Sequence, residues 1–197
     1  ALRELIAHCT SGAGGFTPSD FPLAGLTQAE LDRLAPGGRG VQAIYPLSPL
    51  QEGILFQSVY GDDLHPYLMQ ESYRMEGVDA ALLREAWDRV AAHHPSLRTP
   101  FVWQRLRTPL QVVLPRVELS WDEGDWRGLP DDAREAALQG YLHAERERGF
   151  AMEEAPLMRF ALFRVGERDY QFVWMHHHVF LDGWSAQLVL RDVFACY

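Results

Sequence analysis

Three consecutive histidines near the carboxyl end, His176 to His178, are the side chains best suited to acid–base chemistry. An imidazole gains or loses a proton near neutral pH, so a positioned histidine can serve as a general base. The histidines follow an apolar segment, Tyr170–Met175, and precede Asp182 and Gly183. This order predicts a rigid strand that delivers titratable groups at its end, a carboxylate that fixes the local geometry, and a glycine that permits a sharp turn before a helix.

The same cluster fits two other interpretations, a metal site and histidines that only pack at the end of a strand. Neighbouring strand residues point to opposite faces, so at most His176 and His178 converge on one ion. No nearby cysteine or pair of carboxylates completes a ligand shell. We therefore expect no bound metal, and catalysis and simple packing both stay open as roles for the histidines.

Helical and strand patterns alternate along the chain, which predicts a mixed α/β fold. Helix N-termini are indicated at Thr27 and Ser48, because each hydroxyl stands three residues before a glutamate or glutamine that can reach back to it. The expected helices cover residues 1–8, 27–34, 49–58, 79–93, 132–148 and 184–195. The expected strands cover residues 70–75, 98–103, 110–114, 157–163 and 170–175. Large side chains on both faces of the last strand predict that it is covered on both sides.

Composition narrows the classes of function. The 197 residues are 47% hydrophobic, enough for the core of one domain or of one lobe. A net charge of −9 without a basic cluster disfavours nucleic-acid binding. No apolar run approaches the roughly 20 residues of a membrane span, and the start lacks a signal-peptide pattern. The two cysteines, Cys9 and Cys196, lie near opposite ends and form no zinc or redox pair, so we expect a reduced, cytoplasmic setting.

Three ordered motifs resemble those of the condensation domains of nonribosomal peptide synthetases. His177-His178-x-x-x-Asp182-Gly183 resembles the HHxxxDG signature of this superfamily. The segment from Tyr45 to Phe56 resembles the first core motif of domains that act on peptidyl thioesters, and the segment from His94 to Phe101 resembles the second, RHExLRTxF. Phe150 and residues 156–159 fit the strand entry between the second and third motifs. The resemblance covers about residues 41–197.

The resemblance implies a fold and a domain organisation. The fold is an α/β lobe, a mixed sheet flanked by helices like that of chloramphenicol acetyltransferase, and it forms the first half of a two-lobed condensation domain with the substrate tunnel between the lobes. Residues 43–197 are expected to form this amino-terminal lobe, and residues 27–42 a short helix and linker. Residues 1–26, rich in glycine and proline after the first helix, are expected to be the end of a preceding domain and an interdomain linker.

The resemblance also implies an activity. The amine of an acceptor aminoacyl thioester attacks the carbonyl of a donor peptidyl thioester, and both are delivered on phosphopantetheine arms. The expected partners are the upstream donor and downstream acceptor carrier domains, an adjoining adenylation domain and the missing carboxyl-terminal lobe. No nucleic acid, membrane, metal or directly bound cofactor is expected.

The residue roles implied by the resemblance centre on His178 as the catalytic base, with His177 packed inward in support. Arg98 is expected to pair with Asp182 and hold the histidine loop in shape, at a cost of about 3–5 kcal/mol if the pair is broken. Gly183 is expected to lie beside the substrate path and to tolerate no side chain. Trp184 and Ser185 complete the supporting set. The second motif departs from the family at two positions, His93 for arginine and Pro95 for glutamate.

Two alternatives remain at this level. An epimerization domain shares the histidine motif, although the surrounding residues favour condensation. The chain on its own is also consistent with an inactive lobe that serves only as a docking or structural unit. Residues 5–24 resemble the exit of a preceding epimerization-like or condensation-like domain, which would give a D-configured donor, or they form an ordinary linker.

Overall fold

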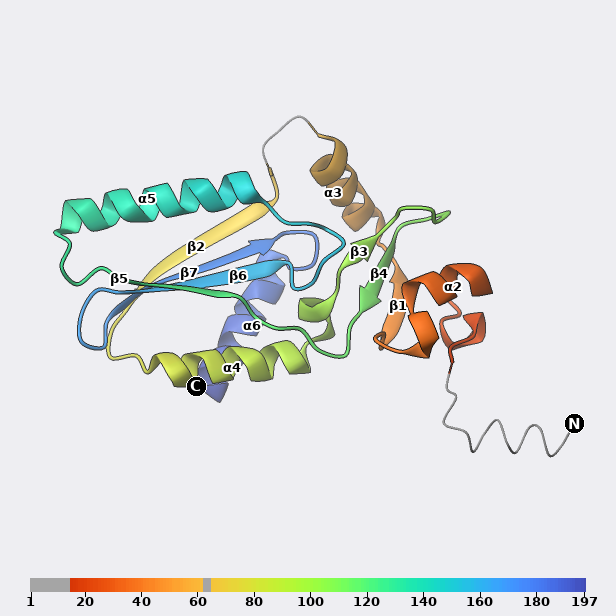
Figure 1. Cartoon of the computed structure of the whole chain (residues 1–197), viewed down its shortest axis with the longest axis horizontal. Coiled ribbons are helices and arrows are strands. Elements are labelled where there is room, and N and C mark those ends of the chain that lie inside the picture. The colour runs from red at the N-terminus through yellow and green to blue at the C-terminus, as the bar shows by residue number, and fades with distance from the viewer. Residues whose placement is uncertain (1–14, 62–64) are drawn as a thin grey trace, which may run out of the picture.

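A computed structural model describes residues 15–61 and 65–197 of the chain (Figure 1). A four-stranded sheet and a three-stranded sheet are flanked by helices, which confirms the mixed α/β fold. The helices are α2 (Gln28–Leu34), α3 (Pro49–Tyr60), α4 (Ala80–His93), α5 (Asp131–Arg148) and α6 (Gly183–Cys196). Short 3₁₀ helices cover Pro18–Asp20, Pro36–Gly38 and Pro95–Arg98. The helix expected over residues 1–8 lies outside the described residues.

The larger sheet consists of β2 (Leu68–Met75), β5 (Trp121–Asp125), β6 (Met158–Arg164) and β7 (Tyr170–His177), in the order β2-β7-β6-β5. β7 runs antiparallel to both neighbours, whereas β5 pairs parallel to β6. Helix α5 covers one face of the sheet, and α4 and α6 cover the other (Figure 1). β7 is therefore buried on both faces, as its sequence predicts.

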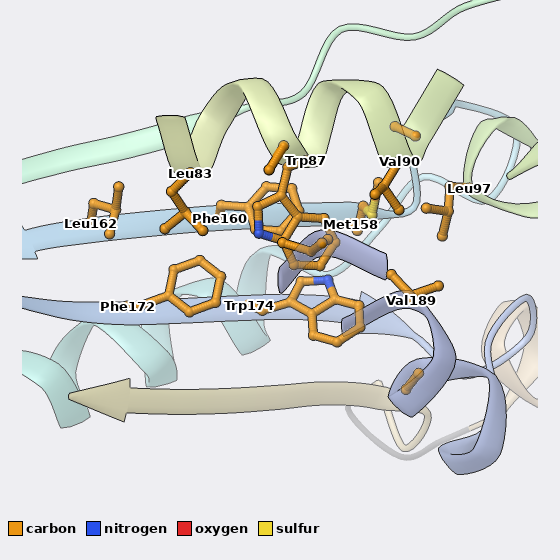
Figure 2. Packing of buried hydrophobic residues seen from close by; sticks show 14 of the residues in the cluster. Leu83, Trp87, Val90, Leu97, Met158, Phe160, Leu162, Phe172, Trp174 and Val189 are labelled. Carbon is orange, nitrogen blue, oxygen red and sulfur yellow. The ribbon is translucent and has the colours of Figure 1, made fainter. Parts of the chain in front are cut away.

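Aromatic packing holds α4 against the larger sheet. The ring of Trp87 from α4 lies 4.5 Å from that of Phe160 and 5.0 Å from that of Trp174, measured between ring centroids. Figure 2 shows these rings packed between the helix and strands β6 and β7, with Val189 of α6 beside them. Burying each large apolar side chain contributes about 1.5–3 kcal/mol. This cluster fixes the strand that ends at the histidines.

The smaller sheet consists of β1 (Ala43–Pro46), β4 (Leu110–Val113) and β3 (Phe101–Val102), in the order β1-β4-β3. The described part of the segment expected to be an interdomain linker, residues 15–26, packs onto this sheet: Phe21, Ala24 and Leu26 are buried in one cluster with Leu31 of α2. Glycine and proline break regular helix and strand in this segment, but they do not prevent the apolar side chains between them from being buried.

The helix predictions agree with the structure more closely than the strand predictions. Both capping boxes form, at Thr27 with Glu30 and at Ser48 with Gln51. Strands β1 and β5 were not predicted, because β1 has four residues and β5 is polar and sits at the edge of its sheet. Most of the strand expected over residues 98–103 was wrong, since only β3 pairs there. None of the helices in the described part of the chain is long and apolar enough to cross a membrane.

Candidate active site

His178 is the first residue after β7, at the end of a strand that is fixed on both sides. Its backbone N–H donates to the carbonyl oxygen of Tyr67, 2.8 Å away, just before β2 begins. The side chain is half-buried, and its Nδ1 lies 2.9 Å from the carbonyl oxygen of Leu181. A carbonyl oxygen only accepts, so Nδ1 carries a proton, and in the neutral ring Nε2 holds the lone pair. The ring is thus oriented as a base at Nε2.

His177 takes the opposite tautomer. The backbone N–H of Val179 donates to its Nδ1 at 3.2 Å, so this atom carries the lone pair, and Nε2 lies 3.1 Å from Oγ of Ser58. The side chain is only 2% exposed, which confirms the expected inward packing. The pKa of His177 is lowered to about 4, chiefly by burial and to a smaller extent by the charges of His65 and His178. The ring is therefore neutral at physiological pH and supports the loop.

His176 points to the face of β7 that packs on α4 and α6. Its ring stacks 4.4 Å from that of Trp174, and burial lowers its pKa to about 4, with smaller contributions from His178 and His177. Its Nδ1 is buried without a hydrogen-bond partner among the described residues. Within residues 15–61 and 65–197, no three side chains of the types that bind metals are grouped so as to hold an ion.

Asp182 is the N-cap of α6. Its Oδ1 accepts from the backbone N–H of Ser185 at 2.7 Å. Hydrogen bonds from Ser185 are the largest cause that lowers the pKa of Asp182 below its ordinary value, and the carboxylate is exposed. The sequence order Asp182–Ser185 thus starts the helix whose first turn follows the histidine loop.

The expected pair between Arg98 and Asp182 is wrong: no hydrogen bond or ion pair joins the two side chains, both of which are described. Arg98 is 3% exposed and donates to the carbonyl oxygen of Ala91 at 3.0 Å, to Oε1 of Gln42 at 2.9 Å and to the carbonyl oxygen of Leu114. These acceptors join α4 to the end of β4 and the start of β1. Because these acceptors bond the buried guanidinium, Arg98 stabilises the core and does not reach the exposed carboxylate of Asp182.

Gly183, Trp184 and Ser185 form the first turn of α6. A side-chain carbon added at Gly183 would meet no atom within 4 Å, and its φ is not positive. The expectation that this glycine makes a sharp turn possible is therefore wrong, because any residue fits its backbone. Trp184 is 78% exposed, and Ser185 uses its backbone N–H for the cap. Their roles toward substrate remain predictions.

Helix α3 supplies contacts that the sequence analysis did not identify. Gln51 donates from Nε2 to the carbonyl oxygen of Val179 at 3.2 Å, and Ser58 bonds His177. The residues in contact are more than a hundred positions apart in the chain. The sequence offered one sign of these contacts. Gln51, Leu55 and Ser58 stand at positions i, i+4 and i+7, which share one helix face.

Comparisons with known proteins point to one family. Residues 41–197 match the family model described as "Condensation domain". A linear gramicidin synthase protein of Brevibacillus parabrevis is 45% identical over 198 residues, covering all of this chain and 3% of that protein. The starter condensation domain of rhizomide synthetase RzmA superposes with a TM-score of 0.68 at 25% identity, over 79% of this chain and 39% of that chain. A four-domain nonribosomal peptide synthetase, holo-AB3403, shares the fold with a TM-score of 0.65 at 22% identity, over 79% of this chain and 12% of that chain. The chain thus spans a small fraction of the curated relatives it matches.

Proposed function

Because this chain belongs to the condensation domain family of nonribosomal peptide synthetases, we propose that it contributes the catalytic base for amide formation between two carrier-bound thioesters. The acceptor's amine nitrogen attacks the donor's thioester carbonyl carbon, a C–N bond forms, the C–S bond breaks, and the donor's thiol leaves. The observation that supports this proposal is the hydrogen bond from Nδ1 of His178 to Leu181, which leaves the lone pair on Nε2 free.

His178 has a defined task in this proposal. An amine of this kind has a pKa of about 7.7–8.0, so a useful fraction is neutral and nucleophilic at physiological pH. Attack leaves a positive charge on nitrogen, and Nε2 of His178 accepts the excess proton. The proton then goes to the departing sulfur, so the histidine returns to its starting state. Before attack, the same Nε2 accepts a hydrogen bond from the amine and orients it.

The partners in this proposal lie outside the chain. We propose that upstream and downstream carrier domains present the donor and acceptor on phosphopantetheine arms, that an adenylation domain adjoins them, and that a second lobe completes the tunnel. The 39% coverage of the RzmA starter domain supports the second lobe, because most of that domain has no counterpart in these 197 residues. The chain by itself is then inactive, with the base in place and the opposite wall missing.

The test replaces His178 by alanine and by glutamine in the intact parent protein with both carrier domains loaded. A positioned base contributes about 10²–10⁴-fold, so we expect the rate of amide formation to fall by that factor. The mass of the carrier-bound product is the readout. It also separates condensation from epimerization, which leaves the mass unchanged. The exposed His143→Gln serves as the control and keeps the wild-type rate. An undiminished rate in both His178 variants would overturn the proposal.

A further inference from the structure

One face of α3 holds the backbone on both sides of the proposed base. Gln51, Leu55 and Ser58 follow one another at intervals of about one turn, and all three meet the segment that contains residues 177–179. Gln51 donates to the carbonyl oxygen of Val179 at 3.2 Å, and Ser58 lies 3.1 Å from Nε2 of His177. Leu55 is buried in the same apolar cluster as Val179. No other helix makes hydrogen bonds of this kind to His177 or Val179 in the described residues.

The donors and acceptors along this route are fixed one after another. The carbonyl oxygen of Ile54 can only accept, so the hydroxyl of Ser58, 2.7 Å away, donates its single proton to this oxygen. Oγ of Ser58 can then only accept, which places the proton of His177 on Nε2. Nδ1 of His177 keeps its lone pair and accepts the backbone N–H of Val179. The hydroxyl of Ser58 and the N–H of Val179 thus favour the same tautomer of a buried ring.

We propose that Ser58 and Gln51 are positioning residues for the condensation reaction. Ser58 bonds the ring of His177, which accepts the N–H of Val179, and Gln51 donates to the carbonyl oxygen of Val179. His178 lies between His177 and Val179 in the chain. Because both neighbours are held, the backbone of His178 is restrained and its Nε2 keeps one direction. The consequence for turnover rests on the proposed function, whereas the tautomer of His177 does not depend on it.

Loss of the hydroxyl has a specific effect in this scheme. In Ser58→Ala, the Nε2 proton of His177 faces no acceptor in a site that is only 2% exposed. Moving the proton to Nδ1 gives no relief, because Nδ1–H would face the N–H of Val179, and two donors cannot bond. The ring therefore keeps its tautomer with an unpaired Nε2–H, and the turn must shift to give this donor another acceptor. A displacement of about 1 Å at a reacting group can cost about 10²-fold in rate.

A second variant, at Gln51, removes the contact with Val179 and keeps the start of helix α3. The Oε1 of Gln51 accepts from the backbone N–H of Ser48 in the capping box. Gln51→Glu keeps an acceptor for that N–H, but it removes the donor to Val179 and places a carboxylate beside a carbonyl oxygen. Helix α3 is therefore retained while the contact with the loop is lost. Gln57→Ala changes an exposed polar side chain of the same helix and serves as the matched control.

The experiment uses the intact parent protein with loaded carriers and ¹⁵N-labelled histidine. We expect Ser58→Ala and Gln51→Glu to lower the single-turnover rate by about 10–100-fold with little change in KM. The nitrogen chemical shifts of His177 should report the Nε2–H tautomer in the wild type, and a changed Nε2 shift, from the lost hydrogen bond, in Ser58→Ala only. Ser58→Thr keeps a hydroxyl that can bond the Ile54 carbonyl, and should restore both readouts.

The outcomes separate this inference from the proposed function. A wild-type rate and an unchanged Nε2 chemical shift of His177 in Ser58→Ala would overturn the inference, even where His178→Ala is inactive. A changed Nε2 shift with a wild-type rate would overturn the positioning role and leave only a structural one. Full activity of His178→Ala would overturn the proposed function, while the chemical-shift measurement would still test the hydrogen-bond route. A Ser58→Ala protein that fails to fold shifts the test to Gln51→Glu and Ser58→Thr, where wild-type turnover in Gln51→Glu counts against the inference.

Discussion

The backbone N–H of Ser185 lies 2.7 Å from Oδ1 of Asp182, which makes the aspartate of the histidine motif the cap of helix α6. The residue before it, Leu181, is buried, and its carbonyl oxygen accepts from Nδ1 of His178. The residues of the motif therefore act together. Asp182 starts the helix, and Leu181 anchors the loop in the core. The carbonyl oxygen of Leu181 fixes the tautomer of His178, the proposed base.

Asp182→Ala should lower the free energy of unfolding by about 1 kcal/mol, because it removes an N-cap. Asp182→Asn retains an acceptor oxygen and should stay within a few tenths of a kcal/mol of the wild type. Denaturant unfolding of the parent domain measures both. Asp79→Ala removes the corresponding cap of α4 and should cost a similar amount. A loss of about 3–5 kcal/mol in Asp182→Ala would instead indicate a broken buried ion pair and contradict the capping role.

Arg98 and Asp182 should act independently. Arg98→Met leaves the acceptors of Ala91, Leu114 and Gln42 without their donor, and should cost about 3 kcal/mol or more. In a double-mutant cycle with Asp182→Ala, the two losses should add within about 0.5 kcal/mol, because the side chains share no partner. Unfolding free energies of the four proteins give the coupling. A coupling energy above about 1 kcal/mol would show that Arg98 and Asp182 interact after all, as the family resemblance implies.

Gly183→Ala should fold as well as the wild type. The added carbon meets no neighbouring atom, and alanine reduces the freedom of the unfolded chain, so stability should stay the same or rise by up to about 1 kcal/mol. Amide formation by the parent protein should still fall in Gly183→Ala and further in Gly183→Val, if the glycine lies beside the substrate path. Wild-type turnover in both variants would show that no substrate passes close to this position.

Stability should decline below neutral pH because of His176. The ordinary pKa of 6.5 applies to the unfolded chain, and burial lowers the folded value to about 4. The unfolded state therefore binds the proton first, so the stability contribution is complete above about pH 6.5 and is lost as the pH falls toward 4, by up to about 1.4 kcal/mol per pH unit. His176→Phe keeps the stacking on Trp174 and should flatten this slope. Denaturant unfolding between about pH 7 and pH 5 measures it.

The exposed His143 provides the control for the pH experiment. His143→Gln should leave the slope of stability against pH at its wild-type value, because it changes an exposed surface side chain and leaves the buried histidines in place. The buried His177 keeps its own contribution in the His176→Phe protein, so the slope is reduced but does not vanish. An identical slope in His176→Phe and the wild type would show that His176 does not cause the loss of stability at low pH.

Local patterns in the sequence determined most of the elements and the candidate for the base. The spacing between a hydroxyl and a glutamate or glutamine located the starts of α2 and α3, and alternation of large side chains located β7, because these signals depend on residues close together in the chain. The motif likewise singled out His178, with a carboxylate following at a fixed interval.

Only the tertiary structure decided what those residues touch. The family resemblance paired Arg98 with Asp182, but burial of the guanidinium among the acceptors of three separate segments left the carboxylate to the nearby N–H of Ser185. Ser58 reaches His177 across 119 positions, and no local pattern carries that distance. A hydrogen bond forms where packing brings a donor to an acceptor, so the sequence determined which groups were available, and the fold determined which of them met.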